Sequence, residues 1–386
     1  MPGISGYNVV RRMMPKLAQI VLFSIGLALV SVMYGDQLLS RAGWGCLIVA
    51  TVWILGKSPI KSVNKMIAYP LIALAILSGL QGIDIISRAM PAILVGVYLV
   101  STRIGKAAFV PAGMVATLGG IVLIAQNLIV GAKGGAFFTA TIPNTGPNYN
   151  IAIGAILLGA ILWQSKWQWL AATLAAMAVI VSGTEEGLIA LGLLIIVMII
   201  RQDWSSKTII TIMAMGTTTL IVILLYPQLW QELLDKFSAA SNSNYGDALH
   251  GRLEAYKFAI RDISLLGHGY NPFRANYDSI HSVPLIALQQ TGIIGLGLWL
   301  WVIGYGIFKT RMKYAFTIVL GLSLFDNYLW TYIAAYTWAI AGAASTAKDS
   351  DLIFRKEHIY ASSKLQSRAY ALPAREAGIQ DGYSGL

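Results

Sequence analysis

The stretch RANYDSIHSVPLIALQQTGIIGLGL, residues 274–298, joins two kinds of sequence at one point. Its first eight residues are mostly polar, charged or aromatic and end at His281, and a long apolar run begins within three further residues. Gly292, Gly295 and Gly297 interrupt that run. An apolar run of this length after a polar loop predicts a helix that enters a membrane at its border with water.

The composition of the whole chain indicates the same environment. Hydrophobic residues make up 56% of the chain and charged residues only 12%, which is more apolar than soluble domains are. Crossing a hydrocarbon core of roughly 30 Å takes about 20 apolar residues in a helix, and lipid offers no hydrogen-bond partner to an unpaired backbone group. We therefore predict an all-α integral membrane protein.

Apolar windows along the chain predict about twelve transmembrane helices. Every second connection is rich in Lys and Arg, which places both termini in the cytoplasm. The windows lie near residues 17–34, 42–56, 66–81, 89–101, 107–130, 151–164, 168–182, 187–200, 208–226, 284–308, 314–325 and 328–345.

One long connection divides the predicted chain. It lies on the periplasmic side, and long ordered loops are usually functional. Within it, residues 246–267 predict a short amphipathic helix that begins after Asp247 and is stopped by Gly267. The predicted parts are residues 1–226 with the first nine spans, 227–283 as the periplasmic loop with short helices and the candidate active site, 284–346 with the last three spans, and 347–386 as a mobile cytoplasmic tail.

His281 is the candidate catalytic residue. It ends the polar loop beside Ser282 and precedes a helix that tolerates Pro284 in its first turn, so its ring is expected near a helix N-terminus that favours anionic groups. A neutral imidazole there could accept a proton from a sugar hydroxyl. The alternative is that His281 is an interfacial anchor or a hydrogen-bonded spacer.

Arg252 and Arg274 are candidates for binding a diphosphate, because a guanidinium grips phosphate oxygens in a fork and stays charged at physiological pH. Arg261 is expected to be solvated or paired. Glu185 and Glu186 lie in the outer turn SGTEEG, residues 182–187, where two carboxylates at a membrane face are uncommon. The alternative for this pair is an exposed turn without a role.

Several kinds of site lack support in this sequence. The outer segments contain no Asp-x-Asp pair, no cluster of His and Cys, and no Walker-type loop, so we expect no metal and no cofactor. The short strings GDALHG and GHGY are not interpreted as motifs. The net charge of +11 is attributed to membrane topology, so no nucleic acid is expected as a partner.

Four stretches resemble the bacterial O-antigen polymerase and O-antigen ligase family, membrane glycosyltransferases that act on polyprenyl diphosphate-linked glycans. One is the Asn-rich start of a helix, and another is a Gly-Arg helix followed by a Gly-x-Gly turn. The third is a His-led helix with glycine steps, and the fourth lies near the end of the chain. They are GPNYNIAIGAILLGAI (146–161), GRLEAYKFAIRDISLLGHGYNPF (251–273), HSVPLIALQQTGIIGLGLWL (281–300) and LFDNYLWT (324–331).

The resemblance implies roles for individual residues. It makes His281 the catalytic histidine and Arg252 a ligand of the diphosphate, whereas Arg274 is added because of its proximity. Many relatives carry a Ser-Arg pair in the outer turn where this chain reads SGTEEG, so a second family arginine has no match here. Candidates for orienting the acceptor are Glu185, Glu186, Asn148 and Tyr270.

The implied function is that of an O-antigen polymerase in the bacterial inner membrane, with its active site facing the periplasm. It would transfer glycan from an undecaprenyl diphosphate donor to a sugar hydroxyl of another lipid-linked repeat unit, without a metal. Besides the bilayer and this lipid-linked oligosaccharide, a chain-length regulator and a flippase are candidate partners. The alternatives are an O-antigen ligase with lipid A core as acceptor, and a polytopic transporter or lipid-linked glycan flippase.

Overall fold

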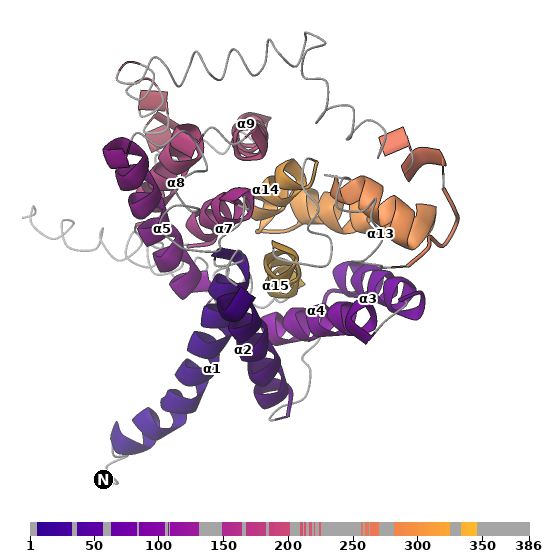
Figure 1. Cartoon of the computed structure of the whole chain (residues 1–386). Helices are drawn as coiled ribbons and strands as arrows, with labels where there is room; N and C mark the ends of the chain where they lie inside the picture. The colour runs from indigo at the N-terminus through magenta and orange to yellow at the C-terminus, as the bar shows by residue number, and fades with distance from the viewer. Residues whose placement is uncertain are drawn as a thin grey trace, which may run out of the picture.

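The structure of the chain is a computed structural model. It describes residues 6–32, 37–56, 63–82, 85–104, 107, 109–130, 149–163, 167–182, 185–200, 282–324 and 333–345, with parts of 209–224 and 256–269. The named elements of this part are all α-helices (Figure 1), which agrees with the all-α class. They are α1 (Gly6–Val32), α2 (Gln37–Leu55), α3 (Lys65–Leu80), α4 (Ile85–Ile104), α5 (Phe109–Val130), α7 (Tyr149–Leu162), α8 (Gln168–Ser182), α9 (Glu185–Ile200), α13 (Val283–Lys309), α14 (Lys313–Ser323) and α15 (Ile333–Ser345).

The prediction of twelve transmembrane helices is wrong. Among the described residues, only α13 is both long and apolar enough to cross a membrane. A second span would arise only if residues 88–104 of α4 and 109–125 of α5 were counted as one span with a bend of 102°. One or two such helices are far fewer than the apolar windows suggested.

Helix length explains part of the error. At 1.5 Å per residue, the 11 residues of α14 extend about 16 Å and the 16 residues of α3 about 24 Å, less than the roughly 30 Å of a hydrocarbon core. The apolar windows other than 208–226, which is described only in part, coincide with helices. They do so because helices that pack against other helices are apolar too. Apolar sequence therefore located the helices but did not tell whether each one traverses a membrane.

α15 is the central helix of the described part (Figure 1). Every residue from 334 to 345 is buried, and α15 contacts α1, α3, α4, α7, α13 and α14. Small residues permit this close approach, since a Cβ on Gly342 would overlap the backbone carbonyl oxygen of Tyr98 in α4. A helix that is apolar on all sides is expected to be buried on all sides, and α15 is.

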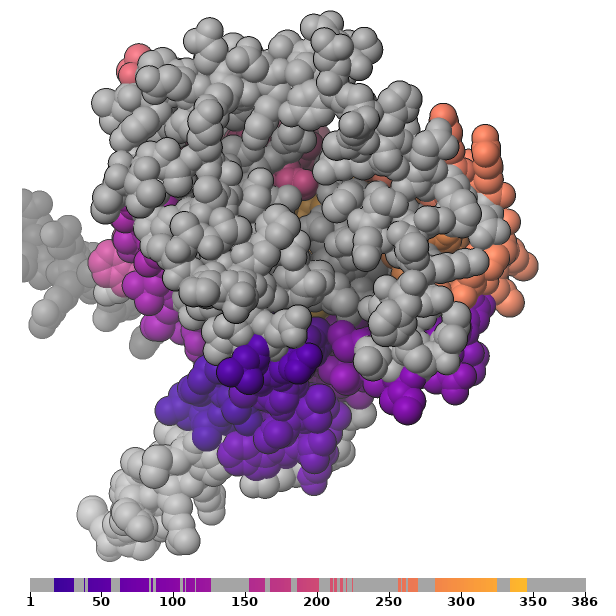
Figure 2. All heavy atoms as spheres, viewed as in Figure 1, coloured from indigo at the N-terminus to yellow at the C-terminus, as the bar shows by residue number. Residues whose placement is uncertain are grey.

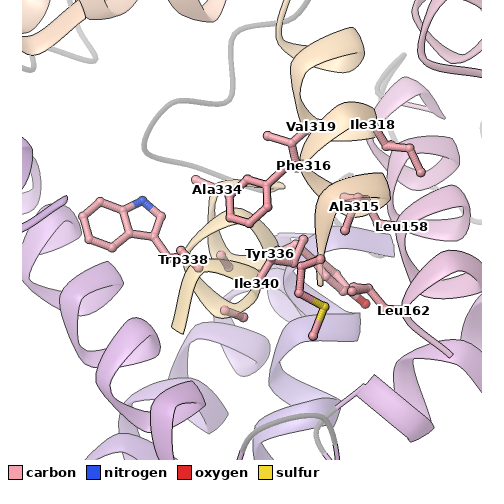
Figure 3. Packing of buried hydrophobic residues seen from close by; sticks show 14 of the residues in the cluster. Leu158, Leu162, Ala315, Phe316, Ile318, Val319, Ala334, Tyr336, Trp338 and Ile340 are labelled. Atoms are coloured by element: carbon pink, nitrogen blue, oxygen red, sulfur yellow. The ribbon is translucent and has the colours of Figure 1, made fainter. Parts of the chain in front are cut away.

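α14 packs tightly against its neighbours and closes the core (Figure 3). Phe316 of α14 is completely buried, and a Cβ on Gly306 of α13 would overlap its ring. Figure 3 shows Phe316 beside Ala334 of α15, with Leu158 of α7 in the same cluster. The last helices of the chain are therefore held by the middle of the chain.

α1 and α2 lie side by side and form one edge of the molecule (Figure 2). Gly26 and Gly43 let the two backbones approach, because a Cβ on Gly26 would lie 2.8 Å from Cγ of Leu47 and one on Gly43 would lie 2.8 Å from the backbone nitrogen of Val30. Their other faces expose large apolar side chains. Such side chains are also exposed on α3, α5, α9 and α13, among them Leu17, Ile25, Val49, Val52, Tyr69, Leu80, Met114, Leu118, Ile200, Trp301 and Phe308.

Candidate functional site

Most of the predicted site residues cannot be placed. His281, Arg252, Arg274, Asn148 and Tyr270 lie outside the described residues. Asp247, the predicted N-cap of the loop helix, lies outside them as well. The roles assigned to these residues therefore stay predictions, and the site is built here from the described residues that flank them.

The two acidic candidates lie at the start of α9. Glu185 is the first residue of the helix, and Glu186 is only 8% exposed. The partial positive charge of a helix N-terminus stabilises a carboxylate in this position. α9 packs closely on α14 here, since a Cβ on Gly321 would lie 2.5 Å from Cα of Ala190. The exposed-turn alternative is therefore wrong for Glu186, which is buried in the first turn of α9.

The main feature near the predicted site is a break in α13. Gly292 has φ 70° and ψ −169°, which is not helical, and it separates residues 283–291 from residues 293–309. Val283 and Trp299 line one small cavity, although they would lie about 24 Å apart in a straight helix. The two halves of α13 therefore do not share one straight axis.

Residues 264–269 are here named the clip segment. They accept hydrogen bonds from backbone N–H groups that the break leaves without a helical partner. In an unbroken helix, the N–H groups of Ile293 and Ile294 would donate to carbonyls four residues earlier. Instead, the N–H of Ile293 donates to the carbonyl of Ser264 at 3.1 Å, and that of Ile294 donates to Leu265 at 3.3 Å. The second half of α13 thus begins with its first backbone donors satisfied.

The clip segment also pairs with the acceptors on the other side of the break. The carbonyl of Gln289 accepts from the N–H of His268 at 2.9 Å, and the carbonyl of Gln290 accepts from that of Gly269 at 2.8 Å. These two carbonyls are the ones that lost their helical partners at positions 293 and 294. Four hydrogen bonds to one segment therefore compensate for the helical bonds lost at the break.

Three glycines make this arrangement possible. Gly267, Gly269 and Gly292 all have positive φ, at 76°, 79° and 70°. A Cβ on Gly267 would overlap the backbone carbonyl of Gln290, and one on Gly292 would overlap that of Leu265. Only a residue without a side chain allows both the backbone conformation and the close approach.

α3 holds the clip segment from the other side. The side-chain Nε2 of Gln81, directly after α3, donates to the carbonyl of Leu266 at 2.9 Å. A Cβ on Gly269 would overlap the backbone carbonyl of Gln81. The clip segment is therefore held between the end of α3 and the break of α13.

Both described ends of the segment 270–281 lie at the first half of α13. Gly269, before this segment, bonds to Gln290. Ser282, after it, is the N-cap of the same half-helix, and Pro284 occupies the first turn as predicted. The part of the chain that contains Arg274 and His281 is therefore attached at both ends to residues 282–290.

One small cavity, lined mostly by apolar side chains, lies between the two halves of α13 and their neighbours. It has a volume of about 10 Å³ and lies between α3, α13 and α15, and its lining includes Leu71, Val283, Trp299 and Trp338. This is room for about one water molecule. A sugar does not fit there, so this cavity is not a substrate site.

The sequence contained signals for this arrangement that were not interpreted. GHGY, residues 267–270, is too short to count as a motif, yet both of its glycines take the positive φ that the clip segment requires. The string QQTG, residues 289–292, places polar side chains inside an apolar run, and the helix breaks there. A polar interruption of a long apolar helix next to a glycine was the available clue.

Comparison with known proteins adds no family to these observations. No protein-family model matches the chain, and a search of curated proteins finds no match.

Proposed function

We propose that the chain is a bacterial O-antigen polymerase, a membrane glycosyltransferase that works without a metal. The donor is a glycan on undecaprenyl diphosphate, and the acceptor is a sugar hydroxyl of a second lipid-linked repeat unit. The acceptor oxygen attacks the anomeric carbon, the bond from that carbon to the diphosphate breaks, and undecaprenyl diphosphate leaves. The proton of the acceptor hydroxyl goes to His281.

The observation that carries this proposal is the junction between the clip segment and the break of α13. The clip segment belongs to the stretch 251–273 and the break to the stretch 281–300, two of the four that resemble the polymerase and ligase family. Four backbone hydrogen bonds join them. A junction of this kind supports a shared site, because it attaches the intervening residues to one half-helix at both ends.

The proposed roles follow from charge and chemistry. Arg252 and Arg274 neutralise the charge that grows on the diphosphate as it leaves, a type of electrostatic stabilisation worth about 3 kcal/mol per preorganised donor. Glu185, Glu186, Asn148 and Tyr270 are the candidates for orienting the acceptor. The described position of Glu186, buried at the N-terminus of α9, suits a carboxylate that is held in one orientation.

Exposed apolar faces support the bacterial inner membrane as the location. Large apolar side chains are exposed on α1, α2, α3, α5, α9 and α13. Where such side chains form large exposed patches, they usually mark a contact with a membrane or a partner. A bilayer would cover such faces without requiring that each helix spans it. The lipid-linked substrate of the proposed reaction resides in the same membrane.

Complementation tests the reaction. The chain is expressed in a strain that lacks its own O-antigen polymerase and, separately, in one that lacks its ligase, and lipopolysaccharide ladders are compared on gels. We expect a ladder of long glycan chains in the strain that lacks its polymerase. We expect no ladder in the strain that lacks its ligase. Restoration only in the second strain would make the chain a ligase, and restoration in neither would overturn the proposal.

His281→Ala tests the proposed base. We expect no long chains from a protein that is still inserted in the membrane, because no other group is proposed to take the proton. His358→Ala, in the tail 347–386, is the matched control and should retain the ladder. A normal ladder from His281→Ala would refute the assignment.

Arg252→Lys tests the diphosphate contact. A lysine keeps the charge but cannot form the forked contact, so we expect polymerisation about a hundredfold slower. Arg261→Lys is the control, because Arg261 is exposed in the structure. Equal rates for the two variants would remove Arg252 from the site.

A further inference from the structure

The start of α3 lies beside the end of α13 (Figure 1). The side-chain Nδ2 of Asn64, the N-cap of α3, donates to the hydroxyl of Tyr305 at 3.1 Å. The indole Nε1 of Trp301 donates to the carbonyl of Met66 at 3.0 Å. At the other end of α3, Gln81 bonds to the clip segment, which pairs with the first half of α13. The two helices are therefore antiparallel, and the 16 residues of α3, about 24 Å, separate their two ends.

Two lysines flank the contact between Asn64 and Tyr305. Lys65, the first residue of α3, directly follows Asn64 and is exposed. Lys309, the last residue of α13, is exposed as well and lies one turn after Tyr305 on the same face of the helix. The hydrogen bond between Asn64 and Tyr305 therefore brings two positive charges from distant parts of the sequence to one end of the helix pair.

The turn from α13 to α14 adds two more basic residues. Arg311 is exposed, and Nζ of Lys313 lies 4.9 Å from the centroid of the Tyr314 ring. Among the described residues, the only carboxylates belong to Glu185 and Glu186 at the start of α9, so none is on α3, on α13 or in this turn. The four basic residues at this end are here named the basic edge: Lys65, Lys309, Arg311 and Lys313. Such an edge attracts an anionic partner.

Exposed apolar and aromatic side chains adjoin the basic edge. Met66 and Tyr69 of α3 and Trp301 and Phe308 of α13 are each more than half exposed. Trp301 and Phe308 are separated by about two turns, so they share one face of α13 with Lys309. Aromatic rings next to basic side chains are typical of the level of the lipid headgroups at a membrane surface.

We propose that the basic edge binds the headgroup of an anionic phospholipid, whose acyl chains cover the adjoining face of Met66, Tyr69, Trp301 and Phe308. This inference rests on the proposed membrane location and not on the proposed reaction. A phospholipid combines the two chemistries that lie side by side here, because its phosphate pairs with basic side chains and its acyl chains cover apolar surface. Basic residues at a membrane surface favour anionic lipid over neutral lipid.

A lipid titration of the purified full chain in a neutral detergent tests the proposal. The probes are phosphatidylglycerol and phosphatidylcholine with the same fluorescently labelled acyl chains. We expect the wild type to bind phosphatidylglycerol about tenfold more tightly, and to lose this preference at high salt, because salt screens exposed charges. Equal affinities for the two lipids at low salt would overturn the proposal.

A double variant, Lys65→Gln with Lys309→Gln, locates the site. We expect it to bind phosphatidylglycerol about tenfold more weakly than the wild type and phosphatidylcholine equally well. Both lysines are exposed, so the variant should fold, and arginine at both positions should retain the binding. Wild-type affinity of the glutamine variant for phosphatidylglycerol would show that the headgroup does not bind here.

The matched control is Lys257→Gln with Arg261→Gln. It removes the same number of charges from two exposed residues that precede the clip segment, and it should leave lipid binding unchanged. If this control loses as much affinity for phosphatidylglycerol as the first double variant, net charge explains the binding and the basic edge is not a site.

Lipid binding and glycan synthesis separate this inference from the proposed reaction. If the chain prefers phosphatidylglycerol through Lys65 and Lys309 but restores no ladder in either strain, the lipid site stands and the reaction falls. If a ladder is restored but the preference is missing, the reaction stands and the lipid site falls.

Discussion

α15 and α13 are both apolar helices from the end of the chain, yet they are built in opposite ways. α15 is short, unbroken and buried on every side, and its hydroxyl groups include a paired one at Ser345. α13 is long, broken at Gly292 and exposed along part of its second half. Its first half carries one buried amide, that of Gln289, without a hydrogen-bond partner among the described residues. The difference suggests that α15 supports the fold and that α13 serves the site, since polar groups left unpaired in a core need a reason.

The largest effect should come from the core around α15. Phe316→Ala removes a fully buried ring that packs against Gly306 of α13, and we expect a loss of about 4 kcal/mol in the free energy of unfolding. The control is Phe308→Ala, because Phe308 is 65% exposed, and its effect should stay within about 0.5 kcal/mol. Denaturant titration of the solubilised chain measures both. Equal losses would mean that the described core is not where the stability lies.

The next effect tests the break itself. Gly292→Ala forces a side chain into a backbone region that is essentially restricted to glycine and against the carbonyl of Leu265, so we expect a loss of about 3 kcal/mol. Gly297→Ala, in the second half of α13, meets no atom within 4 Å and should gain roughly 0.5 kcal/mol, since alanine favours a helix. If Gly292→Ala costs no stability, α13 is not broken in solution.

The positions of the helices were predicted well from the sequence. The window 168–182 coincides with α8, and the window 284–308 lies within one residue of α13 at each end, because apolar length marks a helix well. The same windows gave the wrong number of spans, since the hydropathy of a window does not distinguish a lipid-facing helix from one packed in protein.

The site was predicted less well than the helices. The break at Gly292 depends on hydrogen bonds from residues 264–269, about 25 positions earlier, and local patterns carry no information on such a partner. A glycine in an apolar run is usually tolerated in a helix, so it did not indicate a break. Burial of Glu186 likewise depends on how α9 packs in the fold, which periodicity cannot tell.

A smaller effect tests the polar contact that secures α15. The hydroxyl of Ser345 donates to the carbonyl of Ala341 at 2.9 Å, so the hydroxyl of Tyr98, also 2.9 Å from Ser345, must act as the donor in their contact. Tyr98→Phe removes this bond and should cost about 1 kcal/mol. The double variant with Ser345→Ala should cost less than the sum of the two single changes. Strict additivity would show that the pair does not interact.

The last effect is a gain in stability and belongs to the first half of α13. Gln289→Met replaces an unpaired buried amide by an apolar side chain of similar shape, so no hydrogen bond is lost and the desolvation cost of the amide disappears. We expect the free energy of unfolding to rise by about 1 kcal/mol. Thermal unfolding of the solubilised chain measures the change. A loss of stability would mean that the amide already has a partner inside the protein, and the contrast between α13 and α15 would then concern backbone geometry alone.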